Sequence, residues 1–388
     1  MKISAERERE FIALRRELHK YPELGLEEYK TSKLIAEYLQ DLGIEVTTGI
    51  AKTGVVGLIQ GKSGSKTLLI RADIDALPIT ETAEIEFKSQ NAGVMHACGH
   101  DFHTAILLGT AKELFSVRDS FKGNIKLIFQ PAEESFGGAE QMIKEGVMNS
   151  PEVDAAVCYH VAPLPVGTVE LQSGAVTAAP DYFQIHIKGR GGHGSAPEDC
   201  INPVVIAAAI TNRLGEIKAG KADTPFVVSV CSIAGGTCEN VIPDTATIKG
   251  TSRSTDKETR RYLYETIKSI CEEEAGREGA AASVDYNFRY PIVINDEGLT
   301  SDFAETAGAL LGQENVVKPQ KISMVGDDFS YFSELVPSCY ARLGVGESNL
   351  LHTPNFNPDE RAIAIGVDIM TDFALSFLQR SESDDRIR

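Results

Sequence analysis

The sequence DYFQIHIK at residues 181–188 is typical of a β-strand, and it begins a change in the order of the predicted elements. After it the sequence predicts a helix over 202–217, strands over 226–233 and 244–251, a helix over 256–275 and a strand over 282–289. This order, β-α-β-β-α-β, is that of the split βαβ or ferredoxin-like unit. The block 181–290 is therefore predicted to form one α+β domain.

The segments on both sides of this block follow a different rhythm, in which strands alternate with helices. Before the block we predict helices over 5–20 and 27–42 and strands over 44–48, 54–61, 67–73, 126–129 and 153–160, with a Gly/Ser-rich turn at 61–66. After it we predict a helix over 298–312, a strand over 338–345 and a helix over 361–379. Such alternation favours an α/β core. Residues 1–180 and 291–388 are thus expected to form one discontinuous α/β domain, with 181–290 inserted into it.

The composition is that of a folded globular protein with an acidic charge balance. The 388 residues include 56 Asp and Glu against 38 Lys and Arg, which gives a formal net charge of −18 at pH 7. This charge repels nucleic acid and anionic membrane surfaces, and the sequence shows no basic patch. No apolar stretch is expected to reach the ~18 residues of a spanning helix. The start, MKISAERERE, is charged, so the expected compartment is the cytoplasm. The seven scattered cysteines, without CxxC spacing, do not predict a disulfide framework.

The densest group of reactive side chains is the sequence HACGHDFH at residues 96–103, which holds three of the eight histidines. Cys98 and His100 offer a thiolate and an imidazole two residues apart on a glycine-containing turn, which suits zinc or a similar divalent transition metal. The alternative is a helix start in which Asp101 is the N-cap and the histidines only pack or form hydrogen bonds. Two potential ligands do not complete a metal site, so this motif alone leaves both interpretations open.

Three other segments carry residues suited to hydrolytic metal chemistry. In QPAEE at residues 130–134, one of the adjacent carboxylates Glu133 and Glu134 could bind a metal while the other moves a proton of the attacking water. A solvated pair of loop glutamates is the alternative. His160 ends the apolar strand VDAAVCYH, where a single histidine is more often structural than a ligand, and His352 lies in LHTPNF at 351–356.

Taken in order, these motifs resemble the amidohydrolase branch of the di-metal aminoacylase and carboxypeptidase family, which includes hippurate hydrolases, indole-acetyl-amino-acid hydrolases and N-acetyl-amino-acid deacetylases. The matching segments cover essentially the whole chain: LRRELHKYPELGLEE, RADIDALP, HACGHDFHTA, FQPAEE, the strand end at His160, GRGGHGSAP, GGTCENVIPD, GTSRS and LHTPNF. Two positions depart from relatives. Asp73 stands where the wider family has a histidine ligand, and Asp327 stands where relatives usually have Glu before Asp-Phe.

The resemblance implies a catalytic domain of the di-metal peptidase type, with two divalent metal ions per chain such as zinc, manganese, cobalt or nickel. It implies five metal ligands, with the cysteine near both ions: Cys98, His100, Glu134, His160 and His352. Glu133 would be the catalytic acid and base. Asp75 and His103 would orient the ligands through hydrogen bonds.

The resemblance also implies that the inserted domain is a lid and the interface of a homodimer. His193, in its glycine-rich turn, would stabilise the oxyanion, from its own chain or across the dimer. Asn240 and Arg253 would hold the substrate, with the Arg253 guanidinium suited to a free carboxylate. The alternatives are a flexible turn at His193 and an ordinary exposed strand arginine at 253.

The implied reaction is cleavage of the amide bond of a small-molecule N-acyl-amino acid, which releases a carboxylic acid and a free amino acid. A metallo-dipeptidase or carboxypeptidase is the alternative, because the same site could cleave either amide. A metal- or substrate-binding protein without catalysis is a third possibility, against which the presence of the Glu133 carboxylate argues.

Overall fold

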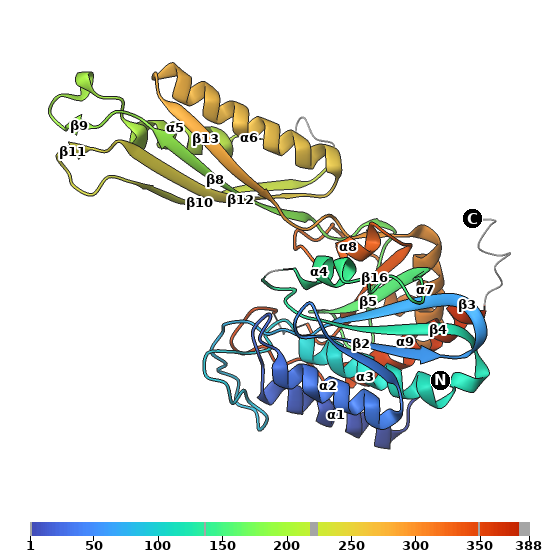
Figure 1. The fold of residues 1–388 in the computed structure, drawn as a ribbon. Coiled ribbons are helices and arrows are strands. Elements are labelled where there is room, and N and C mark those ends of the chain that lie inside the picture. Colours follow the sequence, from blue (N-terminus) through green and yellow to red (C-terminus); the bar gives the residue numbers. More distant parts are fainter. Residues whose placement is uncertain (1, 136, 218–223, 348–349, 380–388) are drawn as a thin grey trace. The chain divides into compact units, whose positions relative to one another are not determined.

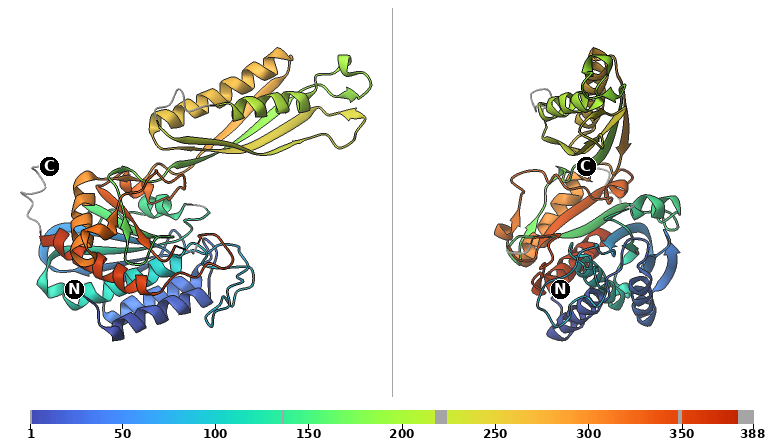
Figure 2. Two further views of the ribbon diagram at one scale, coloured as in Figure 1. Left: turned by 180° about the vertical axis from the view of Figure 1, so that it is seen from behind. Right: turned by 90° about the vertical axis from the view of Figure 1, so that its left-hand side faces the viewer.

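The computed structural model describes residues 2–135, 137–217, 224–347 and 350–379 (Figures 1 and 2). The chain divides into two compact units. Unit 1 comprises Met1–Gly174, Ile294–Gln320 and Asp328–Arg388, and unit 2 comprises Ala175–Val293 and Lys321–Asp327.

Unit 1 is built around an eight-stranded mixed sheet with the order β1-β2-β4-β3-β5-β16-β6-β15. Its strands are β1 (Glu45–Ile50), β2 (Gly54–Gln60), β3 (Lys62–Asp73), β4 (Lys122–Gln130), β5 (Ala155–Ala162), β6 (Val169–Glu170), β15 (Val316–Val317) and β16 (Ser338–Gly344). β3 pairs in parallel with β4 and β5, and β16 pairs in parallel with β5. The carboxyl ends of these four strands therefore lie along one edge, which is where open α/β sheets bind their ligands.

Helices from both ends of the chain complete unit 1. They are α1 (Ala5–Lys20), α2 (Tyr29–Leu42), α3 (His100–Ser116), α4 (Gly138–Lys144), α7 (Glu297–Leu311), α8 (Ser330–Ser333) and α9 (Arg361–Gln379). α3 and α9 pack against each other and against the sheet, and α1 packs against α3. Phe11 of α1, Phe102 of α3 and Phe373 of α9 are all buried in the shared core.

One expectation about membranes needs correction. Among the described residues, α9 is long and apolar enough, by length and composition, to cross a membrane. However, 61% of its apolar stretch is buried inside the protein. A helix in the core of a globular protein can have the same length and apolar composition as a membrane-spanning helix, and α9 is buried like such a core helix.

Most predicted elements agree with the observed ones, and α1 and α9 have the predicted bounds. The expected turn at 61–66 is wrong, because β3 already begins at Lys62, which pairs with Lys122. A register shift separates this pair from the regular pairing that begins at Thr67, and the small residues between them accommodate the irregularity. The N-cap of α3 is Gly99 and not Asp101, whose side chain contacts α1 instead.

Unit 2 contains a four-stranded antiparallel sheet with the order β10-β12-β8-β13. Its elements follow the chain as β8 (Ala179–Lys188), α5 (Pro203–Gly215), β10 (Phe226–Gly235), β12 (Thr245–Ser254), α6 (Lys257–Arg277) and β13 (Ala281–Phe288). This strand order is that of the predicted ferredoxin-like unit. Both helices pack on one face of the sheet, where Ile185 of β8 contributes to a core with Ile210 of α5 and Ile267 of α6 (Figure 1). The short strands β9 (Gly192–His193) and β11 (Val241–Ile242) pair with each other.

Candidate metal centre

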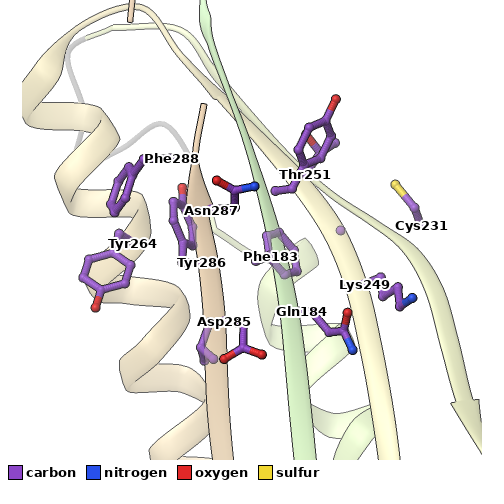
Figure 3. A pocket seen from close by; sticks show the side chains of 13 residues that line it. Phe183, Gln184, Cys231, Lys249, Thr251, Tyr264, Asp285, Tyr286, Asn287 and Phe288 are labelled. Carbon is purple, nitrogen blue, oxygen red and sulfur yellow. The ribbon is translucent and has the colours of Figure 1, made fainter. Parts of the chain in front are cut away.

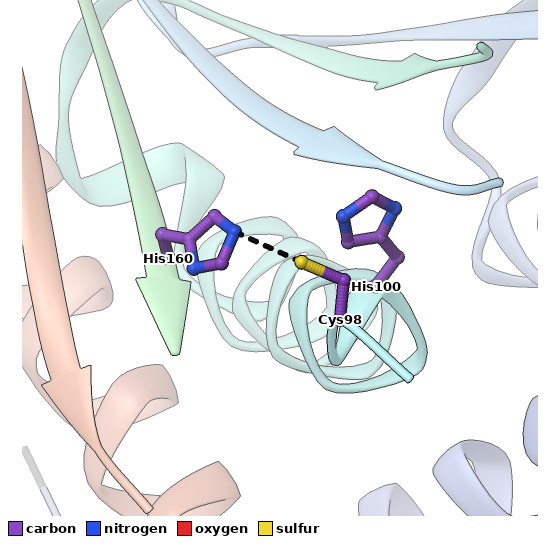
Figure 4. Close-up of side chains that lie close together, drawn as sticks. All are labelled: Cys98, His100 and His160. Carbon is purple, nitrogen blue, oxygen red and sulfur yellow. Dashed lines mark hydrogen bonds between the residues drawn. The ribbon is translucent and has the colours of Figure 1, made fainter. Parts of the chain in front are cut away.

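A glycine with an unusual backbone conformation places two of the predicted ligands. Cys98 precedes α3, His100 is its first residue, and Gly99 between them has φ 85°. A Cβ at Gly99 would lie 2.4 Å from Cγ2 of Val161, so a larger residue would face both backbone strain and a steric clash. This turn points the Cys98 thiol toward His160, near the carboxyl end of β5, and places the His100 ring close by (Figure 4).

The Cys98 thiol lies between two histidines from distant parts of unit 1. Its Sγ is 3.5 Å from Nε2 of His160 and 3.3 Å from Nε2 of His352. Glu134, which follows β4, places Oε1 3.1 Å from Nε2 of His352 and 3.9 Å from Nε2 of His100. Four segments of the chain therefore converge on this thiol.

The five side chains form two groups of three that share Cys98. The ligand atoms of Cys98, His100 and His160 lie within 4.8 Å of one another, and those of Cys98, Glu134 and His352 do so as well. A thiolate, imidazoles and a carboxylate at this spacing suit zinc or a similar divalent transition metal. The arrangement fits two ions with the thiolate between them.

In the rings of His100 and His160, a contact at Nδ1 leaves Nε2 facing the candidate metal centre. Nδ1 of His100 lies 3.1 Å from Oδ1 of Asp75, and Nδ1 of His160 lies 2.7 Å from the carbonyl oxygen of Val161. The neutral form of each ring then has its lone pair on Nε2. Nε2 of His100 is buried and has no hydrogen-bond partner among the described residues. A metal ion would satisfy this atom, since buried polar atoms are rarely left unpaired.

Asp75 contacts two of the segments that carry predicted ligands. Its Oδ1 contacts Nδ1 of His100, and its Oδ2 accepts a hydrogen bond of 3.0 Å from the backbone N–H of Glu134. One buried carboxylate therefore fixes both the His100 ring and the chain at Glu134.

Both ring nitrogens of His103 are occupied within the protein. Nδ1 lies 2.5 Å from Oδ1 of Asp73, and Nε2 accepts a hydrogen bond of 2.9 Å from the N–H of Val161. Asp73 also accepts a hydrogen bond of 2.7 Å from Arg71. His103 thus holds the end of β5 beside His160, and Asp73 is paired with buried Arg71.

The charges around the centre keep protons on two of the predicted ligands when no metal is bound. Burial, together with Glu134, raises the pKa of the Cys98 thiol well above its usual value. Burial lowers the pKa of His100, but the Asp73 and Asp75 carboxylates outweigh this and raise it to about 10. Burial lowers the pKa of His160 to about 3. A divalent cation would replace protons in this acidic environment.

Glu133 lies beside the predicted ligands, on a turn that a hydrogen bond to a distant segment of the chain stabilises. Its side chain is buried, and its carboxylate lies within 4.8 Å of ligand atoms of His100 and Glu134. The preceding residue, Ala132, has φ 56°, which is unfavourable for a residue with a side chain. The Ala132 N–H donates a hydrogen bond of 2.9 Å to Oε1 of buried Glu28, which stabilises this turn.

Comparison with known proteins identifies the family. The family model for peptidase family M20/M25/M40 matches residues 69–376. The chain belongs to this family. A thermostable carboxypeptidase 2 of Saccharolobus solfataricus is 41% identical over 92% of each chain, and an N-acetyl-L-cysteine deacetylase of Bacillus subtilis is 38% identical over 92% of this chain and 85% of the other. A Bacillus subtilis crystal structure described as a dinuclear metal-binding peptidase of the M20 family is 35% identical, with a TM-score of 0.87 over 97% of this chain and 99% of that one.

The resemblance inferred from the sequence is therefore confirmed, and the remaining predicted residues of this M20-family chain lie in unit 2. His193 in β9 is exposed, and its Nδ1 lies 2.7 Å from Oγ of Ser195. Asn240 is adjacent, because its carbonyl oxygen accepts a hydrogen bond of 2.8 Å from the N–H of Gly194. Arg253 lies near the far end of β12, with its guanidinium 5.8 Å from the ring centroid of Tyr182.

The structure does not bring His193 and Arg253 together. β9 and β11 lie at one end of the unit 2 sheet (Figure 1), next to Thr245, where β12 begins. Arg253 lies eight residues after Thr245 in β12, a distance of roughly 26 Å at 3.3 Å per residue. An N-acyl-amino acid is about two residues long and spans roughly 7 Å. Within one chain, these two side chains are too far apart to contact the same substrate.

Unit 2 also has a pocket of about 820 Å³ whose lining residues include none of the predicted site residues (Figure 3). Aromatic rings of α6 and β13 form one part of it, with the Tyr264 and Tyr286 ring centroids 5.1 Å apart and those of Tyr286 and Phe288 4.7 Å apart. Among the described residues of 175–293, no three potential metal ligands lie within 4.8 Å of one another. The chemistry of this M20-family chain therefore centres on unit 1.

Two features of the site were not predicted from the sequence. Glu28 supports the Ala132 turn from 104 residues away, and buried Arg71 pairs with both Asp73 and Asp328. Glu28 and Arg71 lie in segments that resemble the M20 family, but nothing in their local spacing indicates what they contact. Such long-range hydrogen bonds are visible only after folding.

Proposed function

We propose that this chain is a metal-dependent amidohydrolase that cleaves the amide bond of N-acyl-amino acids and releases a carboxylic acid and a free amino acid. The observation that carries the proposal is the pair of ligand groups sharing Cys98, with the Glu133 carboxylate beside them. The N-acetyl-L-cysteine deacetylase relative, at 38% identity, supports this substrate class.

In the proposed mechanism, Cys98, His100 and His160 would hold one divalent ion, and Cys98, Glu134 and His352 would hold the other. When bound, the ions supply Lewis acidity and lower the pKa of water. Glu133 accepts the proton of the water that attacks the amide carbonyl, and then donates it to the leaving amine nitrogen. The C–N bond breaks as this nitrogen is protonated. Asp75 and His103 keep the ligands oriented throughout.

We further propose that unit 2 forms a homodimer and that His193 stabilises the oxyanion in the partner's site. The roughly 26 Å of β12 between Thr245, at the end of the sheet where β9 lies, and Arg253 supports this division between two chains. β10 is an edge strand of its sheet, and exposed apolar side chains, Ile233 of β10 and Val205 of α5, accompany this edge. An unpaired strand edge favours association. Asn240, which lies next to His193, would contact the substrate in the partner's site, and Arg253 would hold the substrate from its own chain as unit 2 closes as a lid.

Mixing two inactive variants tests the dimer proposal. His193→Ala chains and Glu133→Gln chains should each lack activity, whereas a mixed dimer contains one site with both residues intact. Recovery of part of the activity after subunit exchange is expected. Proven exchange without recovery would show that His193 does not act across the interface.

We also propose a cytoplasmic location. No disulfide joins the seven cysteines, all of which lie in the described part of the chain, and this is usual in a reducing compartment. Fractionation of cells that express the full chain would test this.

The substrate class can be tested with a panel of N-acetyl, N-benzoyl and N-indolylacetyl amino acids beside simple dipeptides and N-blocked peptides, each with added zinc, manganese, cobalt or nickel. We expect cleavage of N-acyl-amino acids that is lost in chelator. The carboxypeptidase relative at 41% identity makes peptide cleavage the alternative function. Faster release of carboxyl-terminal residues from peptides would favour that alternative.

Two adjacent substitutions separate catalysis from metal binding. Glu133→Gln should abolish turnover with metal content near that of the wild type, because it removes only the proton acceptor. Glu134→Gln should lower metal content as well. Glu140→Gln on the exposed surface of α4 is the matched control and should change neither. The opposite behaviour of the first two variants would reverse their assigned roles.

A further inference from the structure

A buried ion network lies behind the turn that carries Cys98 and His100. Arg15 and His19 of α1 have fully buried side chains, and both contact the same oxygen of Asp101. Nε of Arg15 lies 2.7 Å and Nδ1 of His19 lies 2.8 Å from Oδ2 of Asp101. Asp101 directly follows His100, so α1 is connected to the start of α3 at one residue from a predicted ligand.

The network also extends to the segment that carries His352, directly through Arg15 and indirectly through the contact of His19 with Glu81. NH1 of Arg15 donates a hydrogen bond of 3.2 Å to Oε1 of Glu360, eight residues after His352. Nε2 of His19 lies 3.1 Å from Oε1 of Glu81. The next residue, Thr82, donates its N–H to the carbonyl oxygen of Pro354 at 2.6 Å. The network thus spans both ligand-bearing segments.

The backbone of these two segments is joined directly at a strained residue. The N–H of His352 donates a hydrogen bond of 2.8 Å to the carbonyl oxygen of Ala97, next to Cys98. His352 itself has φ 60°, a left-handed conformation that persists in a non-glycine residue only when its surroundings impose it. The contacts through Glu360 and Pro354 restrain the chain on the carboxyl-terminal side of this residue.

The interior position of the network favours a geometric role over a stabilising one. The guanidinium of Arg15 lies between two aromatic rings, 4.7 Å from the centroid of Phe87 and 4.7 Å from that of Phe102. Buried ion pairs contribute little net stability, because desolvation offsets their attraction, and apolar replacements often serve as well. Fixed charges with directional hydrogen bonds do, however, define where each connected segment lies.

We infer that Arg15 and His19 are positioning residues of the metal centre: they hold the turn of Cys98 and His100 and the loop of His352 at the separation that the shared ligand set requires. The inference rests on the proposed function only for the presence of the ions. Neither side chain contacts a ligand atom, so both act through Asp101, Glu81 and Glu360.

The test compares Arg15→Met, Arg15→Lys and His19→Gln with Arg7→Met, a variant of an arginine on α1 whose ion pairs, with Glu10 and Glu113, lie outside the network. Zinc affinity is measured by competition with a chromophoric chelator, and the unfolding of the metal-free proteins by urea. We expect Arg15→Met and His19→Gln to bind zinc about tenfold more weakly, in the range found for outer residues of metal sites. Arg15→Lys should recover part of the loss, and Arg7→Met should match the wild type.

A merely structural role would lower the urea midpoint of the metal-free protein and leave zinc affinity of the folded variants unchanged, and that result would overturn the inference. If Arg15→Met does not fold, His19→Gln and Glu360→Gln provide the same comparison. Because zinc binding is read without substrate, weaker binding by these variants would support the inference even if the wild type cleaved no N-acyl-amino acid. A wild type that binds no divalent ion would overturn both proposals.

Discussion

Metal loading should release protons, and the structure indicates how many. At pH 7 without metal, the Cys98 thiol keeps its proton because its pKa is raised well above the usual value by burial and Glu134. His100 is also protonated, since its pKa is raised to about 10 by carboxylates that outweigh burial. Coordination requires a thiolate and a neutral imidazole. Full loading should therefore release about two protons per chain, plus a fraction from His352, whose pKa is raised by its hydrogen bond to Glu134.

The raised pKa values of Cys98 and His100 determine how metal affinity changes with pH. Because the metal-free form holds more protons than the loaded form, metal affinity should rise with pH up to the pKa values of Cys98 and His100. Each displaced proton contributes about tenfold per pH unit, so the product of the two binding constants should rise about 100-fold per unit around pH 7. His160 should not contribute, because burial lowers its pKa to about 3.

Isothermal titration calorimetry measures this release directly. Zinc is titrated into chelator-treated protein in buffers of equal pH and different ionisation enthalpy, and the slope of the observed heat against that enthalpy gives the number of protons. His186→Gln and Cys231→Ser, which change an exposed histidine and an exposed cysteine of unit 2, should leave the slope unchanged. A slope close to zero in the wild type would refute the reasoning, since it would mean that Cys98 and His100 are already deprotonated or are not ligands.

Three further results are expected. Cys98→Ser should weaken zinc binding strongly, because a hydroxyl is a poorer ligand than a thiolate; elemental analysis after gel filtration would show loss of metal, and full retention would contradict the shared-ligand arrangement. Gly99→Ala should lower stability to urea by about 1–3 kcal/mol through backbone strain and contact with β5, whereas Gly215→Ala, which meets nothing within 4 Å, should not. Glu28→Gln should reduce turnover more than metal content, as measured by kinetics and elemental analysis, because Glu28 holds the turn before Glu133; unchanged kcat would remove this role.

Local pattern was sufficient for most of the helices and strands, but not for the set of candidate ligands. The apolar spacing in 5–20 and 361–379 predicted α1 and α9, because an amphipathic period is a property of neighbouring residues. The order of elements in 181–290 predicted the ferredoxin-like sheet for the same reason. The chemistry and spacing of Cys98 and His100 suggested a metal site but left a helix start as the alternative, and the full set of five ligands was predicted only through the resemblance of the ordered motifs.

Only the tertiary structure decided how these residues are used. Asp101, which its position suggested as an N-cap, instead pairs with Arg15 and His19 of a helix more than 80 residues earlier. His103, in the same motif as the ligands, has both nitrogens engaged by Asp73 and Val161. The sequence by itself therefore determined the fold class and the type of chemistry, because these depend on composition, periodicity and motif. The assignment of each side chain to ligand, orienting or positioning roles depends on hydrogen bonds between distant segments, and these exist only once the parallel strands have brought their carboxyl ends together.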